Sequence, residues 1–311
     1  MMKKIVFLVT FILQASIPLF SQVNDHLLLT GTVEYPALSP IHSPDGNMIA
    51  FTTAGFNGLY IYKLDTGTIQ MISDEPSAGF AFRWSSDSKS ILTRVARYAD
   101  QRRYNSVKIF HIDTGLAEQL SDEYTSLLYL PEWIPGNDRV ILPQKDGSAI
   151  LETGKEPFIT ENETKIVAYS LYDRIVVKDF SNYDEKVLTP FPGSEYLNIS
   201  LSPDRTKIAF EVYGGNLFVM NTDGTGLTDL GTGYNAKWSG DSKQLVYMIT
   251  EDDGHTYTSS DIYIINVDGS GKTNLTNTND IIELNPCISP DGGSIVYESY
   301  KDGAIYLMYL D

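Results

Sequence analysis

The residues best suited to bind a ligand are concentrated in two segments, of which the first is basic and spans residues 94–105. It contains four arginines and two tyrosines, namely Arg94, Arg97, Arg102, Arg103, Tyr98 and Tyr104. The arginines stand out because the chain has 40 acidic and 23 basic residues, a net charge of −17. Guanidinium groups bind carboxylates through paired hydrogen bonds, and phenol rings pack against sugars and peptide side chains. This segment therefore predicts a site for a carboxylate, such as that of an acidic glycan or a peptide C-terminus.

An acidic segment, residues 250–261, supplies the second set of candidates. Its expected partner-binding residues are Asp252, Asp253, His255, Tyr257 and Asp261. Carboxylate oxygens are ligands that Ca²⁺ prefers, but their spacing here does not match an EF-hand. We therefore expect no cofactor and no metal site, with calcium in this segment as the alternative. A third segment, residues 53–58, holds Phe56 and Asn57.

Motifs for catalysis are not evident in the chain. The four histidines, at positions 26, 42, 111 and 255, show no metal-ligand spacing. There is no Gly-x-Ser-x-Gly sequence, and residues 269–273 lack the first glycine of a phosphate-binding loop. We assign no catalytic residue, and non-enzymatic function is favoured.

The elements that position these segments follow from an internal repeat. A turn tetrapeptide, Ser43-Pro44-Asp45-Gly46, recurs in exact or degraded form with its third residue at 45, 87, 136, 162, 204, 241 and 291. Five of the six steps are 37 to 50 residues long, which suits a four-stranded propeller blade. All three tryptophans, Trp84, Trp133 and Trp238, stand immediately before the turn, a position filled by His42, Leu201 and Ile288 in other copies. We call this position the tryptophan position.

Short β-rich runs flank each turn, and no sustained helical period follows residue 21. Four short strands per repeat predict an all-β chain, a single β-propeller of four-stranded antiparallel blades. The pattern resembles the WD40-like (PD40) repeats of the TolB-like propeller family. We expect seven blades, one of them reduced because residues 128–190 hold about seven strands; six blades remain the alternative.

Ring closure is expected to use the start of the folded chain. The last repeat ends after its third strand, and residues 27–31 resemble a fourth strand. An N-terminal strand would complete the last blade and remove an open edge.

The N-terminal residues have the pattern of an export signal. Lys3 and Lys4 precede a nine-residue apolar run, which is shorter than the roughly 20 residues that span a bilayer. We expect residues 1–21 to be a signal peptide and residues 22–311 to be the propeller domain. The only cysteine is Cys287, so the chain has no internal disulfide. These features predict a periplasmic or secreted bacterial protein.

The acidic balance limits the classes of partner. Removal of Lys3 and Lys4 leaves 21 basic and 40 acidic residues, a net charge of −19. Such a surface repels nucleic acid and anionic lipid. We expect a monomer whose mature chain neither binds nucleic acid nor inserts into a membrane.

The topology of a propeller places both charged segments on one face. Each joins a second strand to a third strand, and these connections emerge on the same side of the ring. Arg83, Glu132 and Lys237 are expected near the central axis, with an Arg83–Glu132 pair joining neighbouring blades. The resemblance implies a non-catalytic scaffold that engages a protein or an acidic or zwitterionic envelope glycan. The alternative is a glycan-active lyase or hydrolase, because some propellers of similar repeat type cleave pectate fragments.

Overall fold

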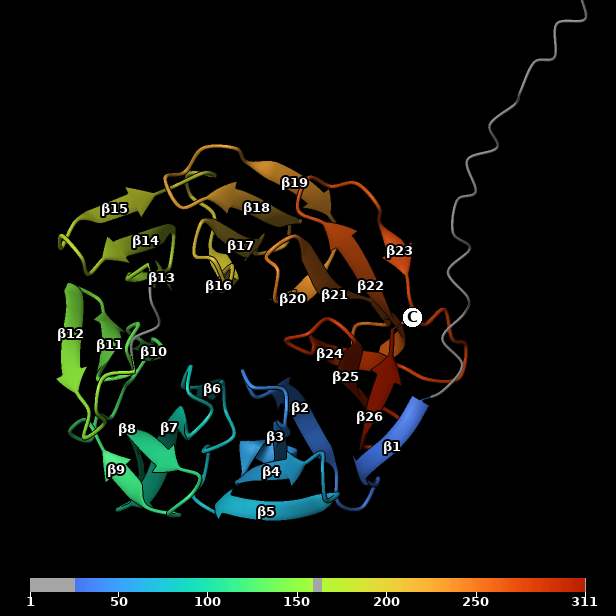
Figure 1. Ribbon diagram of the computed structural model, residues 1–311, viewed down its shortest axis with the longest axis horizontal. Helices are drawn as coiled ribbons and strands as arrows, with labels where there is room; N and C mark the ends of the chain where they lie inside the picture. The colour runs from blue at the N-terminus through green and yellow to red at the C-terminus, as the bar shows by residue number, and fades with distance from the viewer. Residues whose placement is uncertain (1–25, 159–163, 311) are drawn as a thin grey trace, which may run out of the picture.

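The computed structural model describes residues 26–158 and 164–310, and it is a seven-bladed β-propeller. Seven antiparallel sheets surround one axis, with their first strands innermost (Figure 1). The one helical element of the described residues is a short 3-10 turn, η1 (Ala54–Phe56). The all-β prediction and the preference for seven blades over six are therefore confirmed. The expected signal peptide, residues 1–21, and the turn at 160–163 lie outside the described residues.

Five of the sheets contain four strands each, and we number the blades in chain order. Blade 1 is β2 (Ala37–His42), β3 (Met48–Thr53), β4 (Leu59–Lys63) and β5 (Thr68–Ser73). Blade 2 is β6 (Arg83–Trp84), β7 (Ser90–Ala99), β8 (Arg102–His111) and β9 (Ala117–Gln119). Blade 5 is β16 (Tyr196–Leu201), β17 (Lys207–Val212), β18 (Leu217–Asn221) and β19 (Thr228–Gly231). Blade 6 is β20 (Tyr234–Trp238), β21 (Gln244–Asp252), β22 (Tyr257–Asn266) and β23 (Thr273–Asn274). Blade 7 is β24 (Glu283–Ile288), β25 (Ser294–Ser299), β26 (Ala304–Tyr309) and β1 (His26–Gly31).

Two sheets, rather than the one expected, have three strands within the described part of the chain. Blade 3 is β10 (Glu132–Trp133), β11 (Arg139–Gln144) and β12 (Gly147–Glu152). Blade 4 is β13 (Ile166–Leu171), β14 (Arg174–Asp179) and β15 (Glu185–Leu188). Residues 128–190 therefore hold six described strands and not the eight of two full blades. The turn positions 136 and 162 are only 26 residues apart, which is too short for a full blade.

Strand β1 closes the ring as expected. It pairs antiparallel with β26, so that His26 lies opposite Met308 and Gly31 opposite Ala304. His26 Nδ1 also lies 2.6 Å from the Tyr297 hydroxyl of β25. The outer edge of β26 is thus covered by the first described strand of the chain.

The repeated turns are held by a serine and an aspartate two residues apart. In the first copy, Ser43 Oγ donates to Asp45 Oδ1 over 2.5 Å and accepts from Met48 N over 3.0 Å. The same Ser–Asp bond recurs in the copies at residues 85–87, 202–204, 239–241 and 289–291. These aspartates therefore cap the turns.

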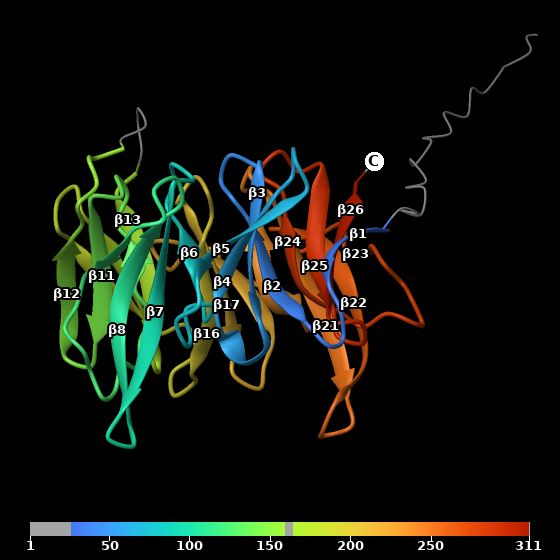
Figure 2. The same cartoon turned by 90° about the horizontal axis from the view of Figure 1, so that it is seen from below.

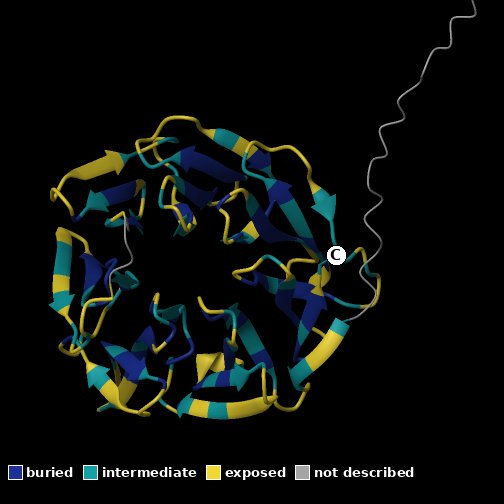
Figure 3. Ribbon diagram, in the orientation of Figure 1, coloured by how far each residue is buried: buried dark blue, intermediate teal, exposed yellow. Residues whose placement is uncertain are grey.

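The core lies between neighbouring sheets. Burial is greatest in the middle strands and falls toward the outer strands (Figure 3). Between blades 1 and 2, for example, fully buried Leu59 and Ile61 pack with Ile91 and Phe82. Because strand side chains alternate between faces, each blade buries one set against each neighbour.

A left-handed residue recurs in the first strands of four blades and just before the first strand of a fifth. Ser39, Ala81, Asn198, Asn235 and Asn285 all have positive φ, between 49° and 54°, and each lies three residues before the tryptophan position. In four of the five blades the register shifts at this residue. Asparagine tolerates this backbone conformation better than most residues, which explains its use in three successive blades.

Two hairpins extend well beyond the ring on one side. They are β7–β8 of blade 2 and β21–β22 of blade 6, and they project in the same direction (Figure 2). The sequence prediction that both charged segments share a face is confirmed.

Candidate binding face

The two charged segments are β-hairpins and not loops, which corrects the sequence interpretation. Residues 94–105 continue the ladder of β7 and β8 up to the pair Ala99–Arg102, leaving only two turn residues. Residues 250–261 likewise pair up to Asp252–Tyr257. Regular pairing fixes which side chains share a face, so the candidate residues can be sorted by strand alternation.

Alternation divides the basic hairpin into two sets. Arg94 and Tyr98 of β7 share a face with Arg103 of β8, which lies opposite Tyr98. Arg97, Arg102 and Tyr104 lie on the other face. The six candidate residues therefore do not form one site.

The second set is an ion-paired cluster. Arg97 binds both carboxylate oxygens of Glu123, through Nε at 2.7 Å and Nη2 at 2.6 Å. Its guanidinium also lies 5.1 Å from the centre of the Tyr104 ring. The Glu123 carboxylate raises the pKa of Arg97, and the arginine lowers that of Glu123. Arg102, near the hairpin tip, is exposed.

Arg94 joins blade 2 to the entry of blade 3. Its Nη1 donates to the carbonyl oxygen of Leu127 over 2.8 Å, and its guanidinium lies 4.7 Å from the Phe80 ring centre. The Nε atom is buried without a hydrogen-bond partner among the described residues. Burial, and secondly the charge of Arg103, lower the pKa of Arg94.

Arg94 lies ten residues after the tryptophan position of its blade. The equivalent position in two other blades also holds a charged residue. Its counterparts in blades 5 and 7 are the buried residues Glu211 and Glu298. Glu211 accepts from Asn235 N at 2.6 Å, and Glu298 accepts from Ser39 N. Each of these three side chains therefore reaches toward the next blade.

The first set lines a cleft of about 510 Å³ at the base of the basic hairpin. Arg103 donates from Nη2 to Ser77 Oγ over 3.0 Å and from Nε to Asn105 Oδ1 over 2.9 Å. The link between blades 1 and 2 runs beside β7, where Ala96 N donates to Pro76 O over 2.7 Å. The lining comes from the β3–β4 connection, this link and the hairpin: Gly55, Phe56, Asn57, Pro76, Ser77, Phe80, Arg94, Tyr98 and Arg103.

Two carboxylates of the acidic hairpin accept hydrogen bonds from backbone N–H groups of the hairpin's own turn. Asp252 accepts from Gly254 N over 2.8 Å, and Asp253 accepts from His255 N and Thr256 N over 2.9 and 2.8 Å. Those backbone donors lower the pKa of Asp253. His255 is exposed, and the Tyr257 ring meets that of Tyr300 edge-on at 5.6 Å.

Asp261 lies deeper and anchors the link to blade 7. Its oxygens accept from Asn274 Nδ2 at 3.0 Å, Thr276 Oγ1 at 3.2 Å and Thr278 N at 3.1 Å. Thr278 also donates to Glu283 Oε1 over 2.7 Å. Glu283 is fully buried, and desolvation raises its pKa to about 7.

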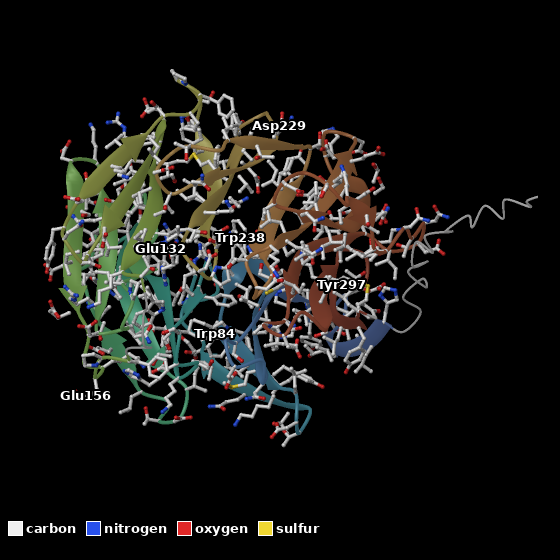
Figure 4. The ribbon with its side chains drawn as sticks, turned by 45° about the horizontal axis from the view of Figure 1, so that its top comes forward. Trp84, Glu132, Glu156, Asp229, Trp238 and Tyr297 are labelled. Carbon is white, nitrogen blue, oxygen red and sulfur yellow. The ribbon has the colours of Figure 1, made fainter. Side chains whose placement is uncertain are left out.

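The expected pair near the axis is present. Arg83 Nε lies 3.4 Å from Glu132 Oε1, joining blades 2 and 3, and Figure 4 places Glu132 on the inner side of the ring. Lys237 donates to Asn235 Oδ1 over 2.7 Å, and desolvation lowers its pKa to about 8. These contacts agree with a structural role for the set.

Sequence reasoning missed three lining residues of the cleft. Pro76, Ser77 and Phe80 lie in the link between blades 1 and 2, which has no charge pattern of its own. Phe80 directly precedes the left-handed Ala81, a backbone feature that alanine does not signal in the sequence.

Within residues 26–158 and 164–310, no group of three or more His, Cys, Asp or Glu side chains has the arrangement of a metal site. In the same ranges, no helix has the length and hydrophobicity needed to cross a membrane.

Comparison with known proteins supports the fold. A TolB protein from Agrobacterium tumefaciens has a TM-score of 0.53 at 14% identity, over 88% of this chain and 90% of that one. An oligogalacturonate lyase from Vibrio parahaemolyticus has a TM-score of 0.47 at 13% identity, over 90% of this chain and 79% of that one. At these identities the TolB likeness establishes a shared propeller fold and nothing finer.

Sequence comparison gives a shorter match. No family model matches the chain. A curated relative, a non-catalytic subunit of a tRNA (guanine-N(7)-)-methyltransferase from Drosophila grimshawi, is 30% identical over 118 residues. The match covers 37% of this chain, which spans 29% of the length of that relative.

Proposed function

We propose that this protein is an exported, non-catalytic binding scaffold that engages a protein or an envelope glycan through the face bearing the β7–β8 and β21–β22 hairpins. The observation that carries the proposal is the projection of both hairpins on one side of the ring (Figure 2). A cleft lies at the base of the first hairpin. Binding sites commonly lie in the connections that a rigid scaffold presents.

The two hairpins have opposite character, which suits a polar partner. Arg102 and Arg103 are exposed on one, and Asp252 and Asp253 on the other. The hairpins belong to blades 2 and 6, so a partner in contact with both would extend across the axis. Complementary charges would orient it and accelerate association.

The experiment is an affinity purification from the native envelope with the wild-type protein and with the double reversal Arg102→Glu, Arg103→Glu. A matched control reverses Lys186 and Lys243, which are exposed and lie away from both hairpins. We expect the double reversal to lose partners that the control retains, with unchanged melting temperatures. Identical partners and yields for all three proteins would contradict a binding role for this face.

A further inference from the structure

The cleft beside the basic hairpin contains two cations, Arg94 and Arg103, that have no acidic partner among the residues that the structure describes. Nearby, Arg97 is paired with Glu123 at 2.6 Å and Lys108 with Glu75 at 2.8 Å. Within the described residues, Arg94 and Arg103 form no ion pair and bind only neutral oxygens. In a chain with 40 acidic residues, this leaves a positive site where the two guanidinium groups repel one another. A bound anion would relieve that repulsion.

One wall of the cleft is apolar and accessible. The Phe56 and Phe80 rings meet edge-on at 5.2 Å, and Pro76 extends this surface. Tyr98 is 63% exposed and Phe56 is 40% exposed, so both rings can be covered by a ligand. Burial of such rings favours binding in proportion to the apolar area removed from water.

The charge of the molecule favours a ligand with one carboxylate over one with many. The net charge of −17 repels a polyanion wherever it extends past the cleft. The C-terminal residue of a peptide places a single carboxylate beside one side chain. That arrangement matches two guanidinium groups beside an aromatic wall.

We propose that this cleft binds the C-terminal carboxylate of a peptide whose last side chain is apolar. The proposal rests on the proposed binding function and names its ligand class. Arg103 forms the main contact with the carboxylate, since Arg94 is already engaged with Leu127. Phe56, Phe80 and Tyr98 receive the last side chain.

The test uses an N-acetylated Gly-Gly-Phe peptide with a free C-terminus, its C-terminal amide and digalacturonate, each titrated calorimetrically against the whole protein. We expect the free acid to bind and the amide to bind at least about tenfold more weakly, because charged hydrogen bonds are lost. Arg103→Gln should weaken binding of the acid to a similar degree. Lys186→Gln removes one positive charge from an exposed position away from both hairpins and should change the affinity by less than about twofold.

Several outcomes would overturn the inference. They are equal affinity for acid and amide, equal effects of the two glutamine variants, no binding of either peptide, or tighter binding of digalacturonate than of the acid. The comparison of acid with amide uses only wild-type protein, so it decides even if Arg103→Gln misfolds. If the peptides fail while the double reversal still loses envelope partners, the inference is wrong and the proposed function stands. If both experiments fail, both proposals are wrong.

Discussion

The indole Nε1 of Trp84 donates a hydrogen bond to the carbonyl oxygen of Ile41 over 3.2 Å, across the boundary between blades 1 and 2. Trp133 makes the same bond to Arg83, and Trp238 to Ser200, each at 3.2 Å. In every case the acceptor is the residue just before the tryptophan position of the preceding blade. The three indole side chains are half-buried, so this position contributes packing as well as a directed bond. Trp84 and Trp238 are labelled in Figure 4.

Replacement of Trp238 separates these two contributions. Trp238→Phe keeps a ring but leaves the Ser200 carbonyl without its donor, and we expect a loss of about 1–3 kcal/mol in the free energy of unfolding. Trp238→Ala also loses the packing and should cost about 3–5 kcal/mol. Urea denaturation measures both. A phenylalanine variant as stable as wild type would show that the indole bond contributes nothing.

Removal of β1 tests ring closure. A chain that begins at Gly31 lacks the partner of β26 and the contact between His26 and Tyr297. We expect a single, cooperative transition at a clearly lower melting temperature, together with concentration-dependent aggregation through the exposed strand. The control begins at His26 and should melt with the full chain. Equal melting temperatures for the two truncated proteins would contradict closure by this strand.

Asn235 tests the left-handed position in the first strands. Its φ is 52°, and its Nδ2 donates to Asn285 Oδ1 over 2.6 Å. Asn235→Ala and Asn235→Gly both lose that bond, but only alanine resists the left-handed conformation. We expect the glycine variant to be the more stable of the two by about 1 kcal/mol, the reverse of the usual order in strands. Thermal denaturation showing alanine as the better replacement would refute this explanation of the repeated asparagines.

Glu283 predicts a specific pH dependence. Burial raises its pKa from 4.5 to about 7, with Asp261 adding to the rise and Lys301 opposing it. The folded state therefore binds the proton more tightly, so the stabilising contribution is complete below pH 4.5 and is lost as the pH rises through 7. Glu283→Gln should match wild type near pH 4.5 and exceed its stability by up to roughly 3 kcal/mol at pH 8.5.

Equilibrium unfolding at both pH values measures this difference. Glu156→Gln removes one charge from an exposed position and serves as the control, with stability expected to change little at either pH (Figure 4). A stability difference between wild type and Glu283→Gln that does not grow with pH would contradict the prediction.

Most of the fold could be read from the sequence because one structural unit is repeated. The Ser43–Asp45 turn recurs with recognisable residues, and the tryptophan position fixes the register of each copy. Blades 3 and 4 were harder to delimit, since their turns lack the serine and aspartate pair. The only sequence sign of the repeated left-handed residue was the asparagine at positions 198, 235 and 285. Three asparagines are too few to predict a left-handed conformation before the backbone is known.

The site could be predicted only in part. The sequence identified the basic segment, but it gave no sign that Arg97 pairs with Glu123, 26 residues away. Strand alternation would have separated Arg103 from Arg102 if the segment had been recognised as a hairpin rather than a loop. Phe80 escaped because its place in the cleft depends on the path of the link between two blades.

The pairing of β1 with β26 also constrains how the chain reaches its folded state. His26 and Met308 are neighbours in space but lie far apart along the chain. Contacts between residues far apart in the sequence form slowly, because the chain between them loses conformational entropy before the contact contributes any stability. We therefore expect blade 7 to be completed late, with β1 unpaired until β26 is in place. Any factor that shields β1 during this interval would raise the yield of folded protein.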